Sequence, residues 1–443
     1  MSSLSSLRAY AREIFLAGLK SVDPLVALRQ LVQLRDNRLG IGERSYDLNQ
    51  LGDVYVLGCG KAAARMARAL EELLGGRITG GVVVVKYGHG LPLEKIKVVE
   101  AGHPVPDSAG VEGARQVMEI AARAGAADLI LFVVSGGGSA LLPMPADGIS
   151  LEDKQLTTQV LLGSGATIHE VNALRKHLSQ LKGGRLASLA SPATLVALIL
   201  SDVVGDDLDA IASGPTVGDP TTYQDCLEML ELYQLRRVIP PAALGLLERG
   251  ARGAIAETAK PSEAIFRKVQ NLIVGSNRLA LAAAHKRAQE LGYRALILSS
   301  TVQGESRNAA KCIAALGKNI LRQNRSVRTP LCLISGGETT VTLGGDGVGG
   351  RNQEFALAAA LEIAGLDNFV LLSAGTDGTD GPTDAAGAIV DGTTVQRGAA
   401  RGLIAAEFLA RNDSYTFLKA TDDLLITGPT FTNVMDLQLV LLG

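Results

Sequence analysis

Short apolar runs alternate with amphipathic segments along most of the chain. Continuous runs of Val, Leu and Ile predict strands, and apolar residues spaced three or four positions apart predict helices. Strands that are apolar at every position are typical of a parallel sheet covered on both faces. The succession of strand and helix therefore predicts a doubly wound parallel sheet in the first half of the chain. We expect strands at 53–57, 81–85, 97–99, 129–134 and 195–200, and helices at 61–74, 109–124, 151–162, 167–181 and 223–235.

A second α/β series follows Pro240-Pro241, the sharpest break in the middle of the chain. A chain of 443 residues is too long for one typical core. We therefore expect two domains, residues 1–240 and 241–443. In the second, we expect strands at 271–274, 293–298, 331–334, 339–343, 369–372 and 436–442, and helices at 278–291, 306–322 and 353–364.

Composition narrows the partners and the compartment. The formal net charge is only −2 and both signs are mixed along the chain, so we expect no nucleic-acid partner. No apolar run reaches the roughly 18 residues of a membrane helix, so we expect no membrane partner. The four cysteines lack paired spacing and fit reduced, mostly buried thiols, which favours a cytoplasmic protein. The N-terminal segment reads as an amphipathic helix with Ala11, Ile14, Phe15 and Leu19 on one face.

Two glycine-rich corners follow buried runs about two hundred residues apart. Ser135-Gly136-Gly137-Gly138-Ser139 follows 129–134, and Ser335-Gly336-Gly337-Glu338 follows 331–334. Glycine lets peptide N–H groups approach an oxyanion without a Cβ in the way, so both corners are candidate anion cradles. A plain tight turn is the alternative. A serine nucleophile is disfavoured, because the Gly-x-Ser-x-Gly spacing is absent.

Two cations stand at expected helix starts, each directly after glycines. Lys61 follows Gly58-Cys59-Gly60, and Arg351 follows Gly349-Gly350. A positive side chain is unfavourable beside the positive end of a helix dipole unless an anion is also present. A solvated lysine is the simpler alternative, but two such cations favour a shared phosphate ligand.

Acidic residues close two further loops. Asp202 follows the strand expected at 195–200, where it could bind Mg²⁺ or accept the proton of a hydroxyl group. Asp377 lies in the loop 376–381, which alternates Asp and Gly but lacks the spacing of a dedicated calcium loop. His103 lies in a rigid loop between Gly102 and Pro104 and is a candidate substrate contact.

These motifs occur together in one order. The set resembles the glycerate 2-kinases of the MOFRL type, and the resemblance covers nearly the whole chain, from Arg12 to Thr430. Phe431 is a departure, because relatives usually carry glycine there. The motifs that carry the resemblance are Gly58-x-Gly-Lys-Ala62, Gly102-His-Pro-Val-Pro-Asp107, Ser135-Gly-Gly-Gly-Ser-Ala140, Ser201-Asp-Val-Val-Gly205, Ser213-Gly-Pro-Thr216, Ser335-Gly-Gly-Glu338, Gly350-Arg-Asn-Gln-Glu354 and Gly375-Thr-Asp-Gly-Thr-Asp-Gly381.

The resemblance implies ATP-dependent phosphorylation of D-glycerate at its 2-hydroxyl, with Mg²⁺. It also implies a Rossmann-like N-terminal lobe, a distinct C-terminal α/β lobe, for which we expect a mixed sheet, and an active site in the cleft between them. The residues expected to act in catalysis are Lys61, Arg351, Asp202 and Asp377. Asp377 and Glu338 are expected to hold the metal ion. Those expected to bind nucleotide or substrate are Gly60, His103, Ser135, Gly136, Gly137, Gly138, Ser139, Gly337, Glu338, Asn352 and Glu354.

Two other functions stay open. An NAD(P)-dependent hydroxypyruvate reductase would need a carboxylate for the nucleotide ribose after the second strand, where the chain has Lys86-Tyr-Gly-His89 instead. A non-catalytic sugar-acid binding protein would use the same anion cradles without needing Lys61, Arg351 and several aspartates together. The expected partners are D-glycerate and ATP, with a homodimer as the assembly to test.

Overall fold

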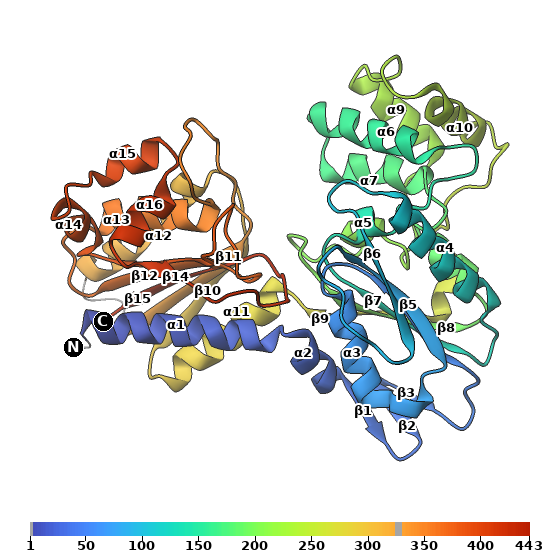
Figure 1. The fold of residues 1–443 in the computed structure, drawn as a ribbon, viewed down its shortest axis with the longest axis horizontal. Coiled ribbons are helices and arrows are strands. Elements are labelled where there is room, and N and C mark those ends of the chain that lie inside the picture. The colour runs from blue at the N-terminus through green and yellow to red at the C-terminus, as the bar shows by residue number, and fades with distance from the viewer. Residues whose placement is uncertain (1–2, 324–329) are drawn as a thin grey trace. The chain divides into compact units, whose positions relative to one another are not determined.

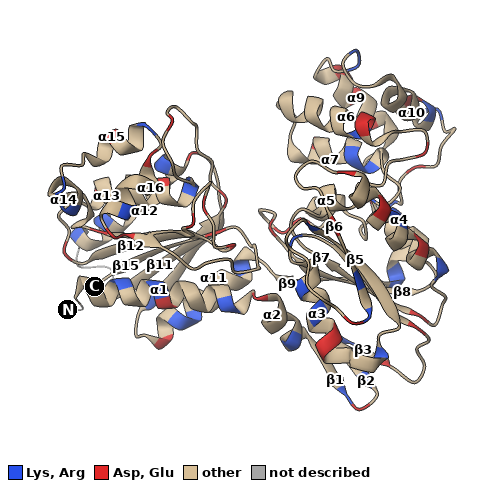
Figure 2. Cartoon of the chain, viewed as in Figure 1, with Lys and Arg blue, Asp and Glu red and all other residues tan. Residues whose placement is uncertain are grey.

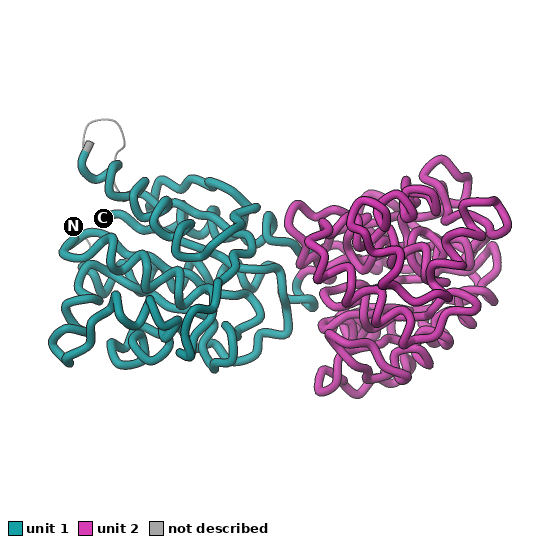
Figure 3. Tube along the Cα trace, turned by 90° about the horizontal axis from the view of Figure 1, so that it is seen from above, with its two compact units in different colours: residues 1–26, 275–443 teal, residues 27–274 magenta. Residues whose placement is uncertain are grey.

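The computed structural model describes residues 3–323 and 330–443. The chain forms two compact units, one of residues 27–274 and the other of residues 1–26 together with 275–443 (Figure 3). Each unit is built around its own six-stranded sheet (Figure 1).

The unit 27–274 contains a Rossmann-type sheet. Its strands lie in the order β6-β5-β4-β7-β8-β9, and each of the first four neighbouring pairs is parallel. In this order the chain moves outward from β4 to one edge and then outward from β7 to the other, so the two strands meet at a switch point. The expectation of a doubly wound parallel sheet is confirmed. The strands are β4 (Val54–Cys59), β5 (Gly80–Lys86), β6 (Ile96–Ala101), β7 (Leu129–Val134), β8 (Thr194–Leu200) and β9 (Val269–Gly275).

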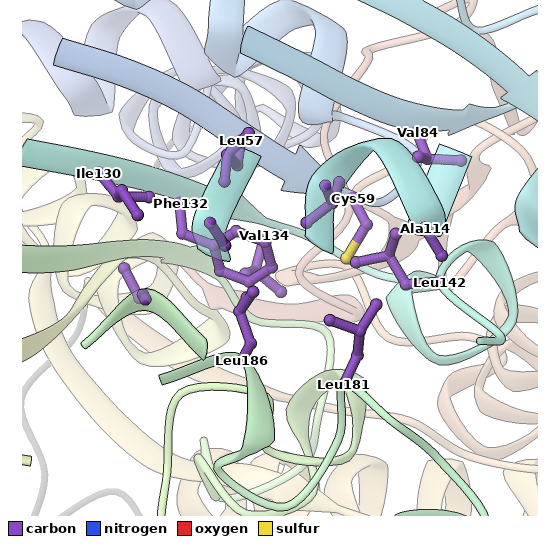
Figure 4. Close-up of a cluster of buried hydrophobic side chains, with 14 of the residues drawn as sticks. Leu57, Cys59, Val84, Ala114, Ile130, Phe132, Val134, Leu142, Leu181 and Leu186 are labelled. Carbon is purple, nitrogen blue, oxygen red and sulfur yellow. The ribbon is translucent and has the colours of Figure 1, made fainter. Parts of the chain in front are cut away.

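The helices that cover this sheet carry small residues, which let them pack closely on its strands. In α4 (Ser108–Arg123), Gly113 packs so closely on Val84 that an added Cβ would lie 2.6 Å from a valine methyl group. Figure 4 shows how Cys59 of β4 lies in the same apolar cluster as Leu142 and Leu181. The cluster therefore continues from the sheet to the segments that follow its strand ends. The other helices beside the sheet are α3 (Ala63–Leu74), α5 (Gly138–Leu141) and α8 (Arg185–Ala190).

A group of helices forms a second core in the same unit. Tyr223, at the start of α9, is buried against Gly250 of α10 and the ring of His177 in α7. The boundary expected at residues 240–241 falls inside this cluster, because Pro241 opens α10 and that helix packs on α9. Here the structure differs from the expected domain limits: the two prolines start a helix and do not separate units. The helices are α6 (Leu151–Gly163), α7 (Ile168–His177), α9 (Tyr223–Leu232) and α10 (Pro241–Ala251).

Residues 24–47, for which no elements were expected, form α2 (Pro24–Leu31) and a small antiparallel sheet. The sheet consists of β1 (Val32–Arg35), β2 (Arg38–Ile41) and β3 (Arg44–Asp47). These strands are only four residues long, and the buried apolar residues in them are Val32, Leu39 and Ile41, so the apolar pattern is too short to predict a strand.

The other unit has a mixed sheet, as expected, in the order β10-β11-β15-β12-β13-β14. Strand β15, from the C-terminal end of the chain, lies antiparallel between β11 and β12. The helix α13 is buried along almost its whole length. The strands are β10 (Arg294–Val302), β11 (Leu331–Gly337), β12 (Phe369–Gly375), β13 (Gly387–Asp391), β14 (Leu424–Leu425) and β15 (Asp436–Leu442); the helices are α11 (Asn277–Glu290), α12 (Ser306–Gln323), α13 (Arg351–Ile363), α14 (Thr394–Ala399), α15 (Ala405–Ala410) and α16 (Ser414–Ala420).

The N-terminal helix α1 (Leu4–Ser21) belongs to this second unit and packs on α11 and on the sheet. Gly18 allows the close approach, since an added Cβ would lie 2.9 Å from the carbonyl oxygen of Ala280. The amphipathic face expected from sequence is confirmed, with Ala11, Ile14 and Phe15 fully buried. The strand expected at 339–343 was wrong: residues there make only an isolated bridge at Thr340.

Charges of both signs are interspersed over both units (Figure 2). Cys59, Cys226 and Cys332 are buried free thiols, as expected, whereas Cys312 is exposed. Among the described residues, no helix has the length and apolar character needed to span a bilayer.

Candidate active site

In the Rossmann-type unit, the loops after β4 and β7 are joined by backbone hydrogen bonds. Strands β4 and β7 are parallel and pair Cys59 with Val134, so both chains turn at the same sheet edge. Directly after this pair, the N–H of Ser135 donates to the carbonyl of Cys59 at 3.0 Å, and the N–H of Lys61 donates to the carbonyl of Gly136 at 2.9 Å. The carboxyl ends of parallel strands at a switch point are where such sheets bind ligands.

Glycine is required at several points of these loops. Gly60 has φ +125°, and an added Cβ would lie 2.2 Å from the hydroxyl oxygen of Ser135. That hydroxyl in turn accepts from the N–H of Ala62 at 2.9 Å. Gly137 has φ +87°, in the left-handed region that favours glycine. The glycine turn 58–60 and the glycine loop 135–139 therefore form one interlocked structure.

Asp202 and His103 both lie against the loop 135–139. An added Cβ on Gly136 would lie 1.9 Å from a carboxylate oxygen of Asp202, and one on Gly137 would lie 2.8 Å from the ring of His103. Asp202 follows β8, the next strand after β7 in the sheet. The structure thus brings together the expected residues of this unit.

The imidazole of His103 is held in its neutral form. Burial lowers its pKa to about 4, and the positive charges of Lys61 and Lys86 and the ring of His89 add to the effect. His103 therefore offers one hydrogen-bond donor and one acceptor, not a charge, near neutral pH.

Lys61 lies just before α3 and is partly exposed. Among the described residues, none forms an ion pair or a hydrogen bond with its Nζ. Its backbone carbonyl lies 3.1 Å from Nδ1 of His89. The cation that the sequence singled out is therefore positioned by its main chain and has its charge available for a ligand.

Ser139 extends the loop toward a buried polar cluster. Its hydroxyl lies 2.8 Å from the hydroxyl of Ser213, which donates to the side-chain oxygen of Asn172 at 3.1 Å. Ser213 and Asn172 are buried. Ser213 belongs to a Ser-Gly-Pro-Thr turn that the sequence marked only as a motif, and nothing in the sequence pointed to Asn172.

In the other unit, three strands bring the remaining motifs to one sheet edge. Gly337 of β11 pairs with Asp436 of β15, which also pairs with Gly375 of β12. Glu338 and the loop 376–381 continue directly from these ends. Gly337 has φ +148°, and an added Cβ would lie 2.2 Å from the carbonyl oxygen of Val302.

Arg351, at the first position of α13, lies between two carboxylates of its own unit. Its Nε and Nη2 donate to both oxygens of Asp436, at 2.6 and 2.9 Å, and its Nη1 donates to Glu338 at 2.8 Å. Although burial acts in the opposite direction, the hydrogen bonds and negative charges of these partners raise the pKa of Arg351. The unfavourable charge at the start of the helix is thus compensated by Asp436, which the sequence analysis had placed only in a closing strand.

Asn352 and Glu354 have their side chains engaged within the fold. The side-chain oxygen of Asn352 accepts from Ser373 at 2.7 Å, and Glu354 binds Arg307 and Asn412. Both residues, which the sequence predicted to contact a ligand, are buried.

The start of α13 is capped by Asp380, which sequence reasoning missed. Its carboxylate accepts from the N–H groups of Asn352 and Gln353 at 3.0 and 2.8 Å. Burial raises its pKa to about 6, against those hydrogen bonds. The alternating Asp-Gly loop 376–381 therefore has a structural role through its second aspartate.

The metal ligands expected from sequence, Asp377 and Glu338, leave this unit's site with a negative balance. Arg351 offsets only one of the charges of Asp436 and Glu338, and Asp377 adds another, with one oxygen accepting from the N–H of Thr379 at 3.1 Å. Among the described residues, no three His, Cys, Asp or Glu side chains form a metal cage. Mg²⁺ bound through one or two carboxylates and substrate phosphates needs no such cage, so the donors present fit that ion.

The chain combines two α/β units. One is a Rossmann-type unit with an interlocked glycine loop, and the other is a mixed-sheet unit with a carboxylate-rich edge. This arrangement is typical of α/β enzymes that act on anionic substrates. Two family models match the chain: a domain of unknown function, DUF4147, over residues 10–248, and the MOFRL family over residues 331–436. The chain is 45% identical to a glycerate 2-kinase of Pyrococcus horikoshii over 94% of its length and 93% of the relative's. It is 44% identical to a putative hydroxypyruvate reductase of Agrobacterium vitis, covering 89% of this chain and all of the relative.

Among solved structures, a glycerate kinase of Thermotoga maritima matches with a TM-score of 0.89 and 42% identity, covering 99% of this chain and all of that one. Identity at this level over nearly full length establishes common descent and a common fold. The chain belongs to the glycerate kinase family, whose DUF4147 and MOFRL segments it contains. It is accordingly a kinase, and the family resemblance stated from its motifs is confirmed.

Proposed function

We propose that the protein transfers the terminal phosphoryl group of ATP to the 2-hydroxyl of D-glycerate. The proposal is carried by one observation: Lys61, with no partner for its Nζ among the described residues, is bonded through its main chain to the glycine loop 135–139 in a chain of this family. Phosphoryl transfer depends on positioning and charge stabilisation, and a free cation beside a glycine loop supplies both.

In the Rossmann-type unit, we assign Lys61 to stabilise negative charge on the transferring phosphoryl group. Asp202 orients the glycerate hydroxyl and accepts its proton, as a carboxylate at the end of a central strand can. Gly60 and the loop from Ser135 to Ser139 contribute backbone donors and hydroxyls. Neutral His103 donates or accepts one hydrogen bond to the substrate.

In the mixed-sheet unit, Arg351 is held rigidly by Asp436 and Glu338 while Nη1 and Nη2 each keep a further N–H. We assign those donors to a phosphate oxygen. Gly337 allows the backbone turn that carries Glu338, and Asn352 and Glu354 act by fixing the start of α13. That one reaction uses residues of both units stays a prediction.

Asp377 and Glu338 are the residues that would hold Mg²⁺, which would neutralise charge on the phosphates of ATP when bound. These carboxylates lie on the loops that follow β11 and β12, the two strands that flank β15, at one end of the sheet. Replacing Asp377 by Asn should raise the Mg²⁺ concentration needed for half-maximal rate, and this is measured by titrating Mg²⁺ at fixed ATP.

Product identification tests the proposed function. Purified protein is incubated with ATP, Mg²⁺ and D-glycerate, and ³¹P NMR distinguishes 2-phosphoglycerate from 3-phosphoglycerate. We expect the 2-phosphate with equimolar ADP. Loss of NADH with hydroxypyruvate in the absence of ATP would instead establish the reductase activity named for the Agrobacterium vitis relative.

The assembly and the compartment remain predictions. We propose a homodimer, which is tested by the mass in solution from light scattering coupled to gel filtration. A cytoplasmic location is tested by cell fractionation against marker enzymes.

A further inference from the structure

Three cationic side chains of the Rossmann-type unit, Lys154, Arg175 and Lys182, have no acidic partner among the residues that the structure describes. Lys154 is 5% exposed and Lys182 is 2% exposed, whereas Arg175 is partly exposed. The Nζ of Lys154 donates to the carbonyl of Pro143 at 2.7 Å, and that of Lys182 donates to the carbonyl of Ala212 at 3.3 Å. Within the described part of the chain, no Asp or Glu forms an ion pair with any of the three. We call these residues the cation cluster.

Lys176, next to Arg175 in α7, shows how the same fold pairs a structural cation. Its side chain is 1% exposed and it contacts two carboxylates, those of Asp209 and Asp219. The Oδ1 of Asp219 lies 3.4 Å from its Nζ. Because a buried charge is normally paired in this way, the cation cluster needs another explanation.

The members of the cation cluster act on one another. Burial lowers the pKa of Lys154, and the charges of Lys182 and Arg175 lower it further. Burial likewise lowers the pKa of Lys182 to about 7, with Arg175 adding to the effect. Burying cations together is costly, and an anion placed among them offsets the cost.

A chain of hydrogen bonds joins the cation cluster to the glycine loop. Ser139 contacts Ser213 at 2.8 Å, Ser213 donates to Oδ1 of Asn172 at 3.1 Å, and Nη1 of Arg175 donates to the same oxygen at 3.5 Å. Both helices that carry members of the cluster, α6 and α7, show charged segments in Figure 2. Two side chains, those of Ser213 and Asn172, therefore connect Arg175 to the loop.

We propose that Arg175 binds the carboxylate of the acceptor, a small 2-hydroxy acid, whose negative charge offsets the cost of burying Lys154 and Lys182 nearby. Arg175 is the most exposed of the three, so the site presents mainly one planar guanidinium, linked through Asn172 to hydroxyl groups. That donor set matches one planar carboxylate better than a run of phosphates. The assignment rests on the proposed function, since it names the group by which the acceptor is held.

The test uses 3-hydroxypropionate, which has the carboxylate but no 2-hydroxyl, as a binding probe that needs no turnover. Calorimetry on the full-length protein should show saturable binding that Arg175→Gln weakens at least tenfold. Arg123→Gln, an exposed arginine at the end of α4, is the matched control and should bind as the wild type. In kinetics, Arg175→Gln should raise KM for D-glycerate at least tenfold and change KM for ATP less than twofold.

Each other result overturns the proposal. A rise in KM for ATP with KM for glycerate unchanged, or competition for the site by inorganic phosphate and not by 3-hydroxypropionate, assigns the cation cluster to the nucleotide. Undetectable binding of the probe to the wild type, or unchanged binding by Arg175→Gln, removes the site. If Arg175→Gln does not fold, Arg175→Lys and Lys182→Met are measured in the same way. Arg175-dependent binding without any phosphorylation would leave the site standing and contradict the kinase assignment alone.

Discussion

The N–H of Lys61 donates to the carbonyl of Gly136, and this bond joins the loops that follow the neighbouring strands β4 and β7. The side chain of Lys61 takes no part in this bond, so main-chain atoms position the residue. This separation lets the lysine charge be removed while the loop structure is kept.

Replacing Lys61 by Met should lower kcat about 100-fold or more, the scale seen when a charge-stabilising donor is removed from an active site. Stability should change by less than about 1 kcal/mol, because the Nζ makes no contact among the described residues that the substitution would break. Steady-state kinetics and urea unfolding measure the two effects. Lys97→Met, at an exposed position of β6, is the control and should match the wild type. A Lys61→Met enzyme with near wild-type kcat would contradict the assigned role.

Replacing Gly136 by Ala should displace Asp202 and reduce activity. The added Cβ would lie 1.9 Å from a carboxylate oxygen of Asp202, so the carboxylate or the loop must move. A displacement of the catalytic group by about 1 Å can cost on the order of 100-fold in rate. Gly245→Ala in α10 is the matched control, because an added Cβ meets nothing within 4 Å there and favours the helix. Equal activities of the two variants would show that Asp202 does not need its present position.

The parts of the fold with long apolar runs could be predicted from sequence, and the parts with weak periodicity could not. The runs at β4, β7 and β8 predicted the sheet, and their ends indicated a candidate ligand-binding edge, which stays a prediction. The strands β1–β3, each four residues long, are too short to carry such a signal. Pro241 was read as a break between domains because a proline opening a helix has the same local sequence as one ending a segment.

The candidate site shows the same division. Glycine loops and the cations after them are local in sequence, so Gly60, Lys61 and Ser135 could be found. The pairing of Arg351 with Asp436 could not, because these residues are 85 positions apart and meet only through the order of strands in the sheet. The same holds for Arg175 and Lys182. Only the folded structure shows that neither forms an ion pair with a carboxylate among the described residues.

Asp436 makes the consequences of replacing Arg351 different from those of replacing Lys61. Arg351→Ala would leave the fully buried carboxylate of Asp436 without its cation, which should destabilise the protein by about 3–5 kcal/mol. In the double variant Arg351→Ala with Asp436→Asn, position 436 no longer carries a buried unpaired charge, so part of this stability should return while activity stays low. Urea unfolding and kcat are measured for both single variants and the double variant. Recovery of activity together with stability would show that Arg351 acts only in the fold.

His103 should titrate far below an ordinary histidine. Its pKa of about 4 lies below the ordinary histidine value of 6.5, since burial and then Lys61, Lys86 and His89 disfavour the imidazolium. As the pH falls below 6.5, the unfolded chain binds this proton first, so the stabilising contribution is complete above pH 6.5 and is lost toward pH 4. Because His103 is only partly buried, solvent screens the effect, and we expect its size to be about 1–2 kcal/mol. NMR titration of the ring signals, with His103→Gln to assign the resonance, measures the pKa directly. In Lys61→Met, that pKa should move upward, because a neighbouring cation is lost; a wild-type value near 6.5 would contradict the neutral, buried imidazole described for the loop.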